Sequence, residues 1–136
     1  MSLHDFSGLL EAAHTQHEPQ RLLFVFAAAE LPADATAAEK QRFERGEGGA
    51  LAPVLCVDKA PEEIRDFAAL AEESRLTGIE WDILFVAAMS GRGGHPPSSD
   101  EASQPLQLMV EAIKSGRIGE FIAVDRNGEF VQLERA

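Results

Sequence analysis

Three short apolar runs, residues 22–29, 54–57 and 83–89, constrain this chain more than any other feature. A run without polar alternation is typical of a strand that is buried on both faces by helices. None of the runs approaches the ~20 residues of a membrane span. Stretches with helical periodicity separate them, which is the pattern of an α/β protein. We therefore predict a mostly parallel central sheet of about five strands covered by about four helices.

The spacing of apolar residues predicts helices over residues 2 to about 17, 36–46, 61–78 and about 104–116. Thr36 and Glu39 match a capping box at the start of the second helix. Pro105 is expected at the start of the last helix, because a proline in a helix interior costs ~3 kcal/mol. Near the C-terminus, Asn127 and Gly128 separate two apolar runs, which predicts an antiparallel β-hairpin.

Length and charge restrict the class of protein further. A chain of 136 residues is expected to form one domain, residues 1–136. Its 23 acidic and 12 basic residues give a formal charge of −11. This balance argues against nucleic acid or an anionic membrane as a partner, because both are bound through Lys and Arg.

Cys56 is the single cysteine of the sequence. It excludes an internal disulfide and any metal site built from several cysteines. Lying within a predicted strand, it is expected to be a small buried hydrophobic residue. The N-terminal residues lack the basic and apolar regions of a signal peptide, which predicts a cytoplasmic protein. The sequence contains no cofactor fingerprint and no set of metal ligands, so we expect neither a cofactor nor a metal.

The most suggestive segment for chemistry is a glycine-rich loop between the third apolar run and the last helix. It consists of Ser90, Gly91, Arg92, Gly93, Gly94 and His95. Its glycines allow backbone N–H groups to approach a ligand closely, and its arginine and histidine can supply charge or a proton. The spacing matches neither a P-loop nor a dinucleotide fingerprint. The alternative is a loop whose glycines only permit tight turns.

Two further candidates, Asp58 and Lys59, follow the second apolar run. The pair has a counterpart in residues 125–126, and residues 22–28 likewise resemble residues 83–89. The likeness fits two β-α-β units related by duplication, or two sets of buried strands with convergent composition. In either case the acidic–basic pairs would follow strand ends, where open α/β sheets bind ligands.

Residues 22–32, 48–61, 85–99 and 125–128, which include the sequences LLFVFAAAELP, CVDKAP and SGRGG, resemble a family of small proteobacterial proteins of about this length. The resemblance covers nearly the whole chain and implies a single-domain protein. Members are sometimes labelled ribonucleotide reductase alpha subunit. That chemistry uses a radical-bearing cysteine and a redox cysteine pair, whereas this sequence has one cysteine. The resemblance therefore transfers no catalytic residue.

Two hypotheses for the function follow. The first is a non-catalytic module that acts through contacts with a protein partner or through self-association as a homodimer, and the absence of a recognisable catalytic constellation favours it. The second is a binding protein or an enzyme that takes a small molecule, anion or nucleotide at the glycine-rich loop with Asp58 and Lys59. An open edge strand with apolar side chains would favour pairing with a second copy.

Overall fold

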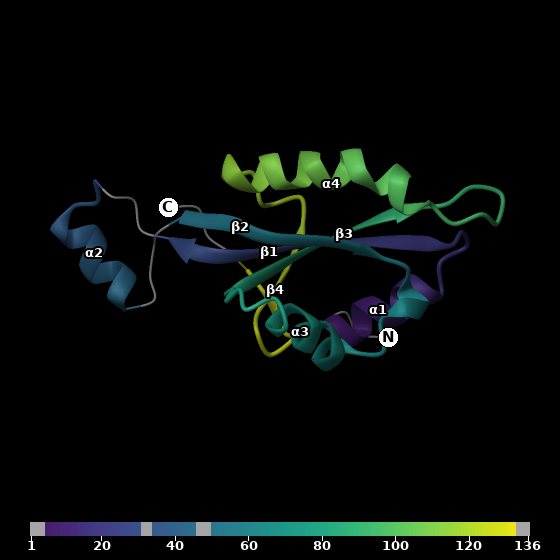
Figure 1. Cartoon of the computed structure of the whole chain (residues 1–136), viewed down its shortest axis with the longest axis horizontal. Helices are drawn as coiled ribbons and strands as arrows, with labels where there is room; N and C mark the ends of the chain where they lie inside the picture. The colour runs from purple at the N-terminus through teal and green to yellow at the C-terminus, as the bar shows by residue number, and fades with distance from the viewer. Residues whose placement is uncertain (1–4, 31–33, 46–49, 133–136) are drawn as a thin grey trace.

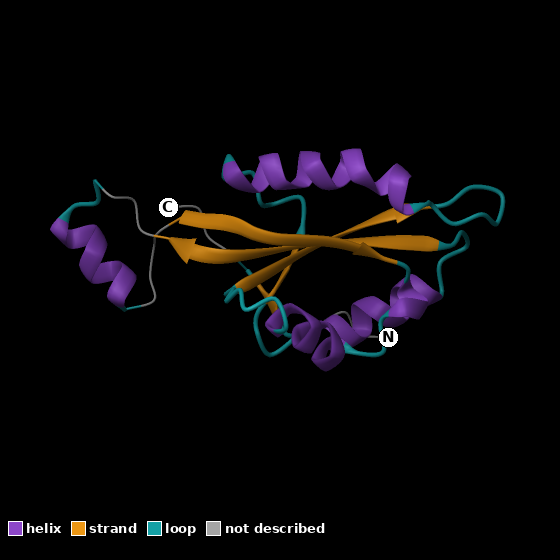
Figure 2. Cartoon of the chain, in the orientation of Figure 1, coloured by secondary structure: helices purple, strands orange, loops and turns teal. Residues whose placement is uncertain are grey.

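The computed structural model describes residues 5–30, 34–45 and 50–132. Its elements follow one another as α1 (Phe6–His14), β1 (Gln20–Glu30), α2 (Ala37–Glu44), β2 (Ala50–Lys59), the 3₁₀ turn η1 (Pro61–Glu63), α3 (Phe67–Arg75), β3 (Ile83–Ser90), α4 (Ser99–Lys114), β4 (Ile122–Val124) and β5 (Phe130–Val131). Figures 1 and 2 show α4 on one face of the sheet, α1 and α3 on the other, and α2 beyond its end.

Across the described residues, the sheet has five strands in the order β2-β1-β3-β4-β5, and every neighbouring pair is antiparallel. The prediction of a mostly parallel sheet is therefore wrong. A parallel pair needs a crossover segment that packs on the sheet. The helix between β1 and β2 cannot serve as one, because α2 has no buried residue and lies off the end of the two strands (Figure 1). The two strands instead pair directly as a long hairpin.

Burial of the central strands on both faces is confirmed. Alternate residues of β1 enter two separate cores, so that Phe24 packs toward α1 and α3 while Val25 packs toward α4. Both side chains are fully buried. The continuous apolar run of β1 thus reflects helices on both sides of the sheet, and such cover does not require that the strands be parallel.

Two helices begin at other residues than predicted, α3 later and α4 earlier, because the N-cap residue lies outside the expected start in each case. After the 3₁₀ turn Pro61–Glu63, the Asp66 carboxylate accepts a hydrogen bond from the Ala69 amide, and α3 begins only there. The helix α4 begins after Ser98, so Pro105 lies inside it rather than at its start. The reciprocal capping of Ser98 and Glu101 fixes this earlier start.

The C-terminal hairpin is confirmed by the antiparallel pairing of β4 with β5. In its turn, the Asp125 carboxylate accepts hydrogen bonds from the amides of Asn127 and Glu129. Gly128 has a φ of 85°, a conformation that favours glycine. The last residue of the predicted second strand, Leu133, lies outside the described residues, as does the predicted start of the first helix at Ser2.

Candidate functional site

The predicted loop is a tight turn that extends the end of β3. Arg92 and His95 exchange two backbone hydrogen bonds, of 3.1 and 3.0 Å, across Gly93 and Gly94. These two glycines have φ values of 58° and 82°, as a two-residue turn of type I′ requires. The Ser90 hydroxyl accepts a hydrogen bond of 3.1 Å from the Gln20 side chain, which joins the start of β1 to the end of β3.

Gly91 is the point of close approach in this loop, and the approach is to the chain itself. Its amide donates a 2.8 Å hydrogen bond to the Pro19 carbonyl. A Cβ atom at this position would collide with the His95 carbonyl oxygen and would lie 3.0 Å from the Pro19 oxygen. The absence of a side chain therefore serves the packing of the turn against the segment that precedes β1.

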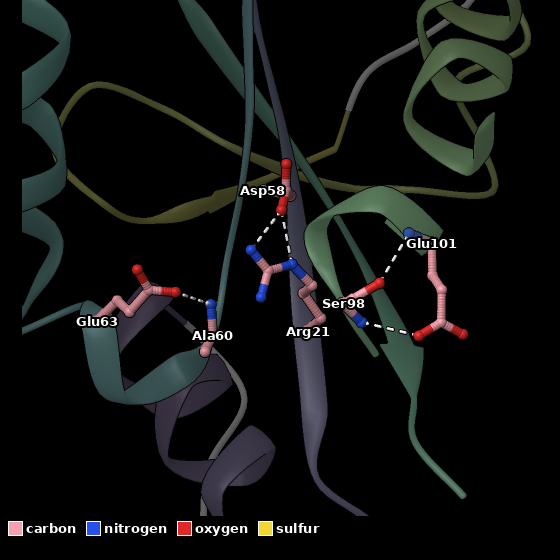
Figure 3. Close-up of polar contacts among 6 residues, drawn as sticks. All are labelled: Arg21, Asp58, Ala60, Glu63, Ser98 and Glu101. Atoms are coloured by element: carbon pink, nitrogen blue, oxygen red, sulfur yellow. Dashed lines mark hydrogen bonds and ion pairs between the residues drawn. The ribbon is translucent and has the colours of Figure 1, made fainter. Parts of the chain in front are cut away.

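Two carboxylates of the chain occupy the donors that an anion would use. The Gly94 amide lies 3.1 and 3.3 Å from the two carboxylate oxygens of Glu18. At the start of α4, the Ser98 amide donates to the Glu101 carboxylate at 3.0 Å (Figure 3). This backbone hydrogen bond is the largest cause of a lowered pKa for Glu101, followed by the Ser98 side chain, and Arg92 adds a smaller effect in the same direction.

A cavity of about 360 Å³ lies beside the turn. It is lined by Met89, Ser90, Gly91, Arg92, His95, Pro96, Pro97 and Glu101. The arginine and histidine are exposed, and the Glu101 carboxylate in the same lining carries the opposite charge. Among the described residues, no cluster of three or more His, Cys, Asp or Glu could hold a metal ion.

Asp58 and Lys59 lie at the same end of the sheet as this turn. The strands β2 and β3 flank β1 and are both antiparallel to it, so their C-terminal ends lie on either side of its start. The Asp58 carboxylate binds Nε and Nη2 of Arg21 at 2.6 and 2.5 Å (Figure 3). Lys59 pairs with Glu73 of α3 at 2.9 Å. Neither residue lines the cavity at the turn.

These two candidates also lie on opposite faces of the sheet. Asp58 is opposite Leu23, which belongs to the core under α4, and Lys59 is opposite Leu22, which belongs to the core over α1 and α3. The structure therefore brings the predicted residues to one end of the sheet without assembling them into one site.

Cys56 is exposed, so the prediction that it is buried is wrong. The reason is its place on β2, which is the first strand in the sheet order and pairs, within the described part of the chain, with β1 alone. The sequence pattern identifies a strand but does not show whether the strand is central or at an edge.

The hydrogen bonds that β1 makes on the side of β3 show which residues of β2 direct their backbone groups outward, away from β1. The Ala27 carbonyl accepts from the Asp82 amide at 2.8 Å, and the Ala29 amide donates to the Asp82 carboxylate at 2.7 Å. Ala27 and Ala29 therefore direct their backbone polar groups toward β3. Their partners on β2, Pro53 and Leu51, must direct theirs away from β1.

The backbone groups of β1 alternate between the β3 side and the β2 side without interruption back to the start of the strand. This holds because the extra residue at the register shift, Val54, lies on β2. Val25 and Leu23 thus also face β3, and their partners Cys56 and Asp58 face outward. Within the described residues, no strand pairs with this edge. The outward backbone groups are those of Leu51, Pro53, Cys56 and Asp58, and all but the proline include an N–H.

Sequence reasoning missed Glu18, Arg21 and the open edge of β2. The contacts of Glu18 and Arg21 join residues 76 and 37 positions apart, and no local pattern encodes such distances. One local signal was available, since α2 shows no apolar stripe that could pack on a sheet as a crossover helix would.

The fold and the candidate surfaces define an antiparallel α/β protein with helices on both faces of the sheet and, as far as residues 5–30, 34–45 and 50–132 show, no strand paired with the outer edge of β2. Among the described residues, no helix is both long and apolar enough to span a membrane. In comparisons with known proteins, no family model, no curated protein and no solved structure matched the chain.

Proposed function

We propose that this protein is a non-catalytic module that binds an extended segment of a protein chain by adding it as a strand beside β2. The observation that supports the proposal is the open edge of this ten-residue strand, with outward N–H groups at Leu51, Cys56 and Asp58. Strand addition uses such groups for affinity, and side-chain contacts supply specificity.

The contrast between the two edges of the sheet supports this proposal. The strand β5 at the far edge has two residues, and Asp5 forms a bridge with Glu129 beside it. Proteins protect edges with short strands, lysines, prolines or bulges. On β2, Pro53 and the bulge at Val54 protect only the first half of the strand. Residues 55–58 include no proline, lysine or bulge.

The side chains of β2 also suit a protein partner. Its two charged residues, Asp58 and Lys59, are both held in ion pairs within the chain. The lysine therefore does not extend from the edge as a free charge that repels an incoming strand. The remaining side chains of the strand are apolar.

The glycine-rich turn supports a structural role more than an anion site. An anion at Gly94 would have to displace the Glu18 carboxylate, and one at the start of α4 would have to displace Glu101. The cavity beside the turn supplies Arg92 and His95, but its lining includes a carboxylate as well. The interaction hypothesis is therefore the better supported of the two.

The test is site-specific photo-crosslinking with a benzophenone amino acid at position 56, and with the same probe at the exposed position 108 on α4 as control. The purified protein is mixed with extract of its own cells and irradiated. The irradiation is then repeated with a large excess of competitor, which is the same protein without the probe and with either Cys56→Ser or Cys56→Pro. Serine keeps the outward N–H, whereas proline removes it without breaking a bond to β1.

We expect adducts from position 56 that the serine competitor suppresses and the proline competitor does not. Thermal melts of both competitors establish that each is folded. Equal suppression by the two folded competitors, or equal adducts from positions 56 and 108, would contradict binding by strand addition.

A further inference from the structure

We infer that the occupant of this edge is a second copy of the same chain, paired antiparallel with Val57 of each copy at the two-fold axis. The inference rests on the proposed function, because it names the partner of the same edge. It follows from the positions of the usable backbone donors, from the symmetry of antiparallel pairing and from the distribution of charge.

The donors available for pairing are confined to a short part of β2. Pro53 faces outward without an N–H, and the extra residue Val54 interrupts the regular alternation. Just beyond the strand, the Ala60 amide donates to the Glu63 carboxylate at 2.8 Å and is already used (Figure 3). The regular outward donors that remain in this part of the strand are Cys56 and Asp58.

These two residues flank Val57, and this arrangement is self-complementary. When two copies pair antiparallel with Val57 opposite Val57, Cys56 of each copy lies opposite Asp58 of the other. Both residues direct N–H and C=O groups outward, so each such pair can exchange both hydrogen bonds. Val57 directs its polar groups toward β1, so the central pair is of the non-hydrogen-bonded type.

The side chains fit the same arrangement. Opposite residues of an antiparallel pair share a face, so the two half-buried Val57 side chains would meet on the face of α1 and α3. On the other face, α4 packs across β2 and β1. A two-fold axis beside β2 therefore brings the two copies of α4 alongside each other over a continuous sheet.

The charge of β2 itself permits contact between two copies. The chain carries a formal charge of −11, so two copies repel each other at long range. In β2, Lys59 balances Asp58, and residues 34–45, which precede it, have three acidic and three basic side chains. The acidic excess lies outside these two segments, and part of it is on α4, which has three acidic residues and one basic residue.

The charge distribution predicts a diagnostic salt dependence. Two copies that repel each other at long range associate more strongly when salt screens the repulsion. A basic partner would be attracted to this acidic chain and would bind less strongly in high salt. Sedimentation at low and high salt therefore separates the second copy from a basic partner.

The pairing register is tested by disulfide formation. In a Cys56→Ser background, Val57→Cys places two cysteines in a non-hydrogen-bonded pair with Cα atoms about 4.5 Å apart, within the range of a disulfide. The native Cys56 residues would be diagonal neighbours at about 7–8 Å and are the matched control. Under mild oxidation we expect disulfide-linked dimers from position 57 at about tenfold the yield from position 56.

Sedimentation of the wild type should show dimers whose fraction rises with salt. Cys56→Ser should behave in the same way, and Cys56→Pro should be monomeric. A wild type that is monomeric at every salt concentration, or equal disulfide yields from positions 56 and 57, would overturn the inference. If the wild type is monomeric while position 56 still gives adducts with other proteins, strand addition stands and the second copy is wrong. If these adducts are also missing, both proposals fail.

Discussion

Replacing Arg21 with methionine would remove the cation from the ion pair that joins β1 to the end of β2. The side chains of Arg21 and Asp58 are 15% and 16% exposed, and both contacts, at 2.5 and 2.6 Å, reach the same carboxylate oxygen. Methionine retains an apolar stem but leaves the Asp58 carboxylate poorly solvated and unpaired. Breaking a fully buried pair costs about 3–5 kcal/mol, so we expect about 2–3 kcal/mol for this partly solvated one.

The loss is measured by urea unfolding, supported by thermal melts. For a chain of this length each kcal/mol corresponds to about 4 °C, so the melting temperature should fall by about 8–12 °C. The matched control is Arg65→Met, because the Arg65–Asp66 pair is long, at 3.6 Å, and its side chains are 80% and 50% exposed. Its loss should cost below about 0.5 kcal/mol.

A double variant separates the cost of the unpaired carboxylate from the loss of the ion pair. Combining Arg21→Met with Asp58→Leu replaces both charges by apolar groups and should recover most of the lost stability, because the unpaired carboxylate is gone. Equal costs for Arg21→Met and Arg65→Met would refute a stabilising role of the Arg21–Asp58 pair. Simply additive costs of the substitutions in β1 and β2 would refute it as well.

Three smaller perturbations test the turn, a cap and a buried contact. Gly91→Ala should cost about 1–3 kcal/mol in urea unfolding, because its Cβ would collide with backbone across the turn; unchanged stability would contradict this packing. The pKa of Glu101 is lowered from 4.5 by the Ser98 amide, so its stabilising effect is complete above 4.5 and is lost as pH falls through the lower folded pKa. Melting temperatures between about pH 5 and about pH 3 should therefore fall less steeply for Glu101→Gln than for the wild type, and equal slopes would refute the role of the cap. The buried Trp81 indole N–H donates to the Ser74 hydroxyl at 2.8 Å. Ser74→Ala should cost about 1–3 kcal/mol in urea unfolding, because it leaves this N–H without an acceptor. Unchanged stability would contradict the contribution of this hydrogen bond.

The apolar runs of the sequence correctly predict the burial of β1 and of the middle of β3, but not the partial exposure of β2 or the direction of the strands. Phe24 and Val25 are consecutive and fully buried on opposite faces, which is why the run in β1 lacks alternation. An antiparallel sheet with helices on both faces imposes the same pattern as a parallel one. The informative difference lies in the helix between β1 and β2, which has no buried residue and so does not pack on the sheet as a crossover helix would.

The candidate site divides in the same way into local and long-range features. The turn around Gly93 and Gly94 could be predicted because tight turns depend on residues that are adjacent in sequence. Its contact with Glu18, and the contact of Asp58 with Arg21, depend on the sheet order. The exposure of Cys56 depends on it too, since the same strand placed centrally would bury that side chain.

The segments that resemble each other in sequence occupy equivalent places in the sheet. Strands β1 and β3 are antiparallel neighbours at its centre, with β2 outside the first and β4 outside the second. The antiparallel pairs β1–β2 and β3–β4 thus lie on either side of the contact between β1 and β3. The two halves differ at their outer strands, because β5 pairs with β4 and, within the described residues, no strand pairs with β2. The place beside β2 is therefore the counterpart of the one that β5 fills, and the proposed strand from another chain would extend the same antiparallel pattern there.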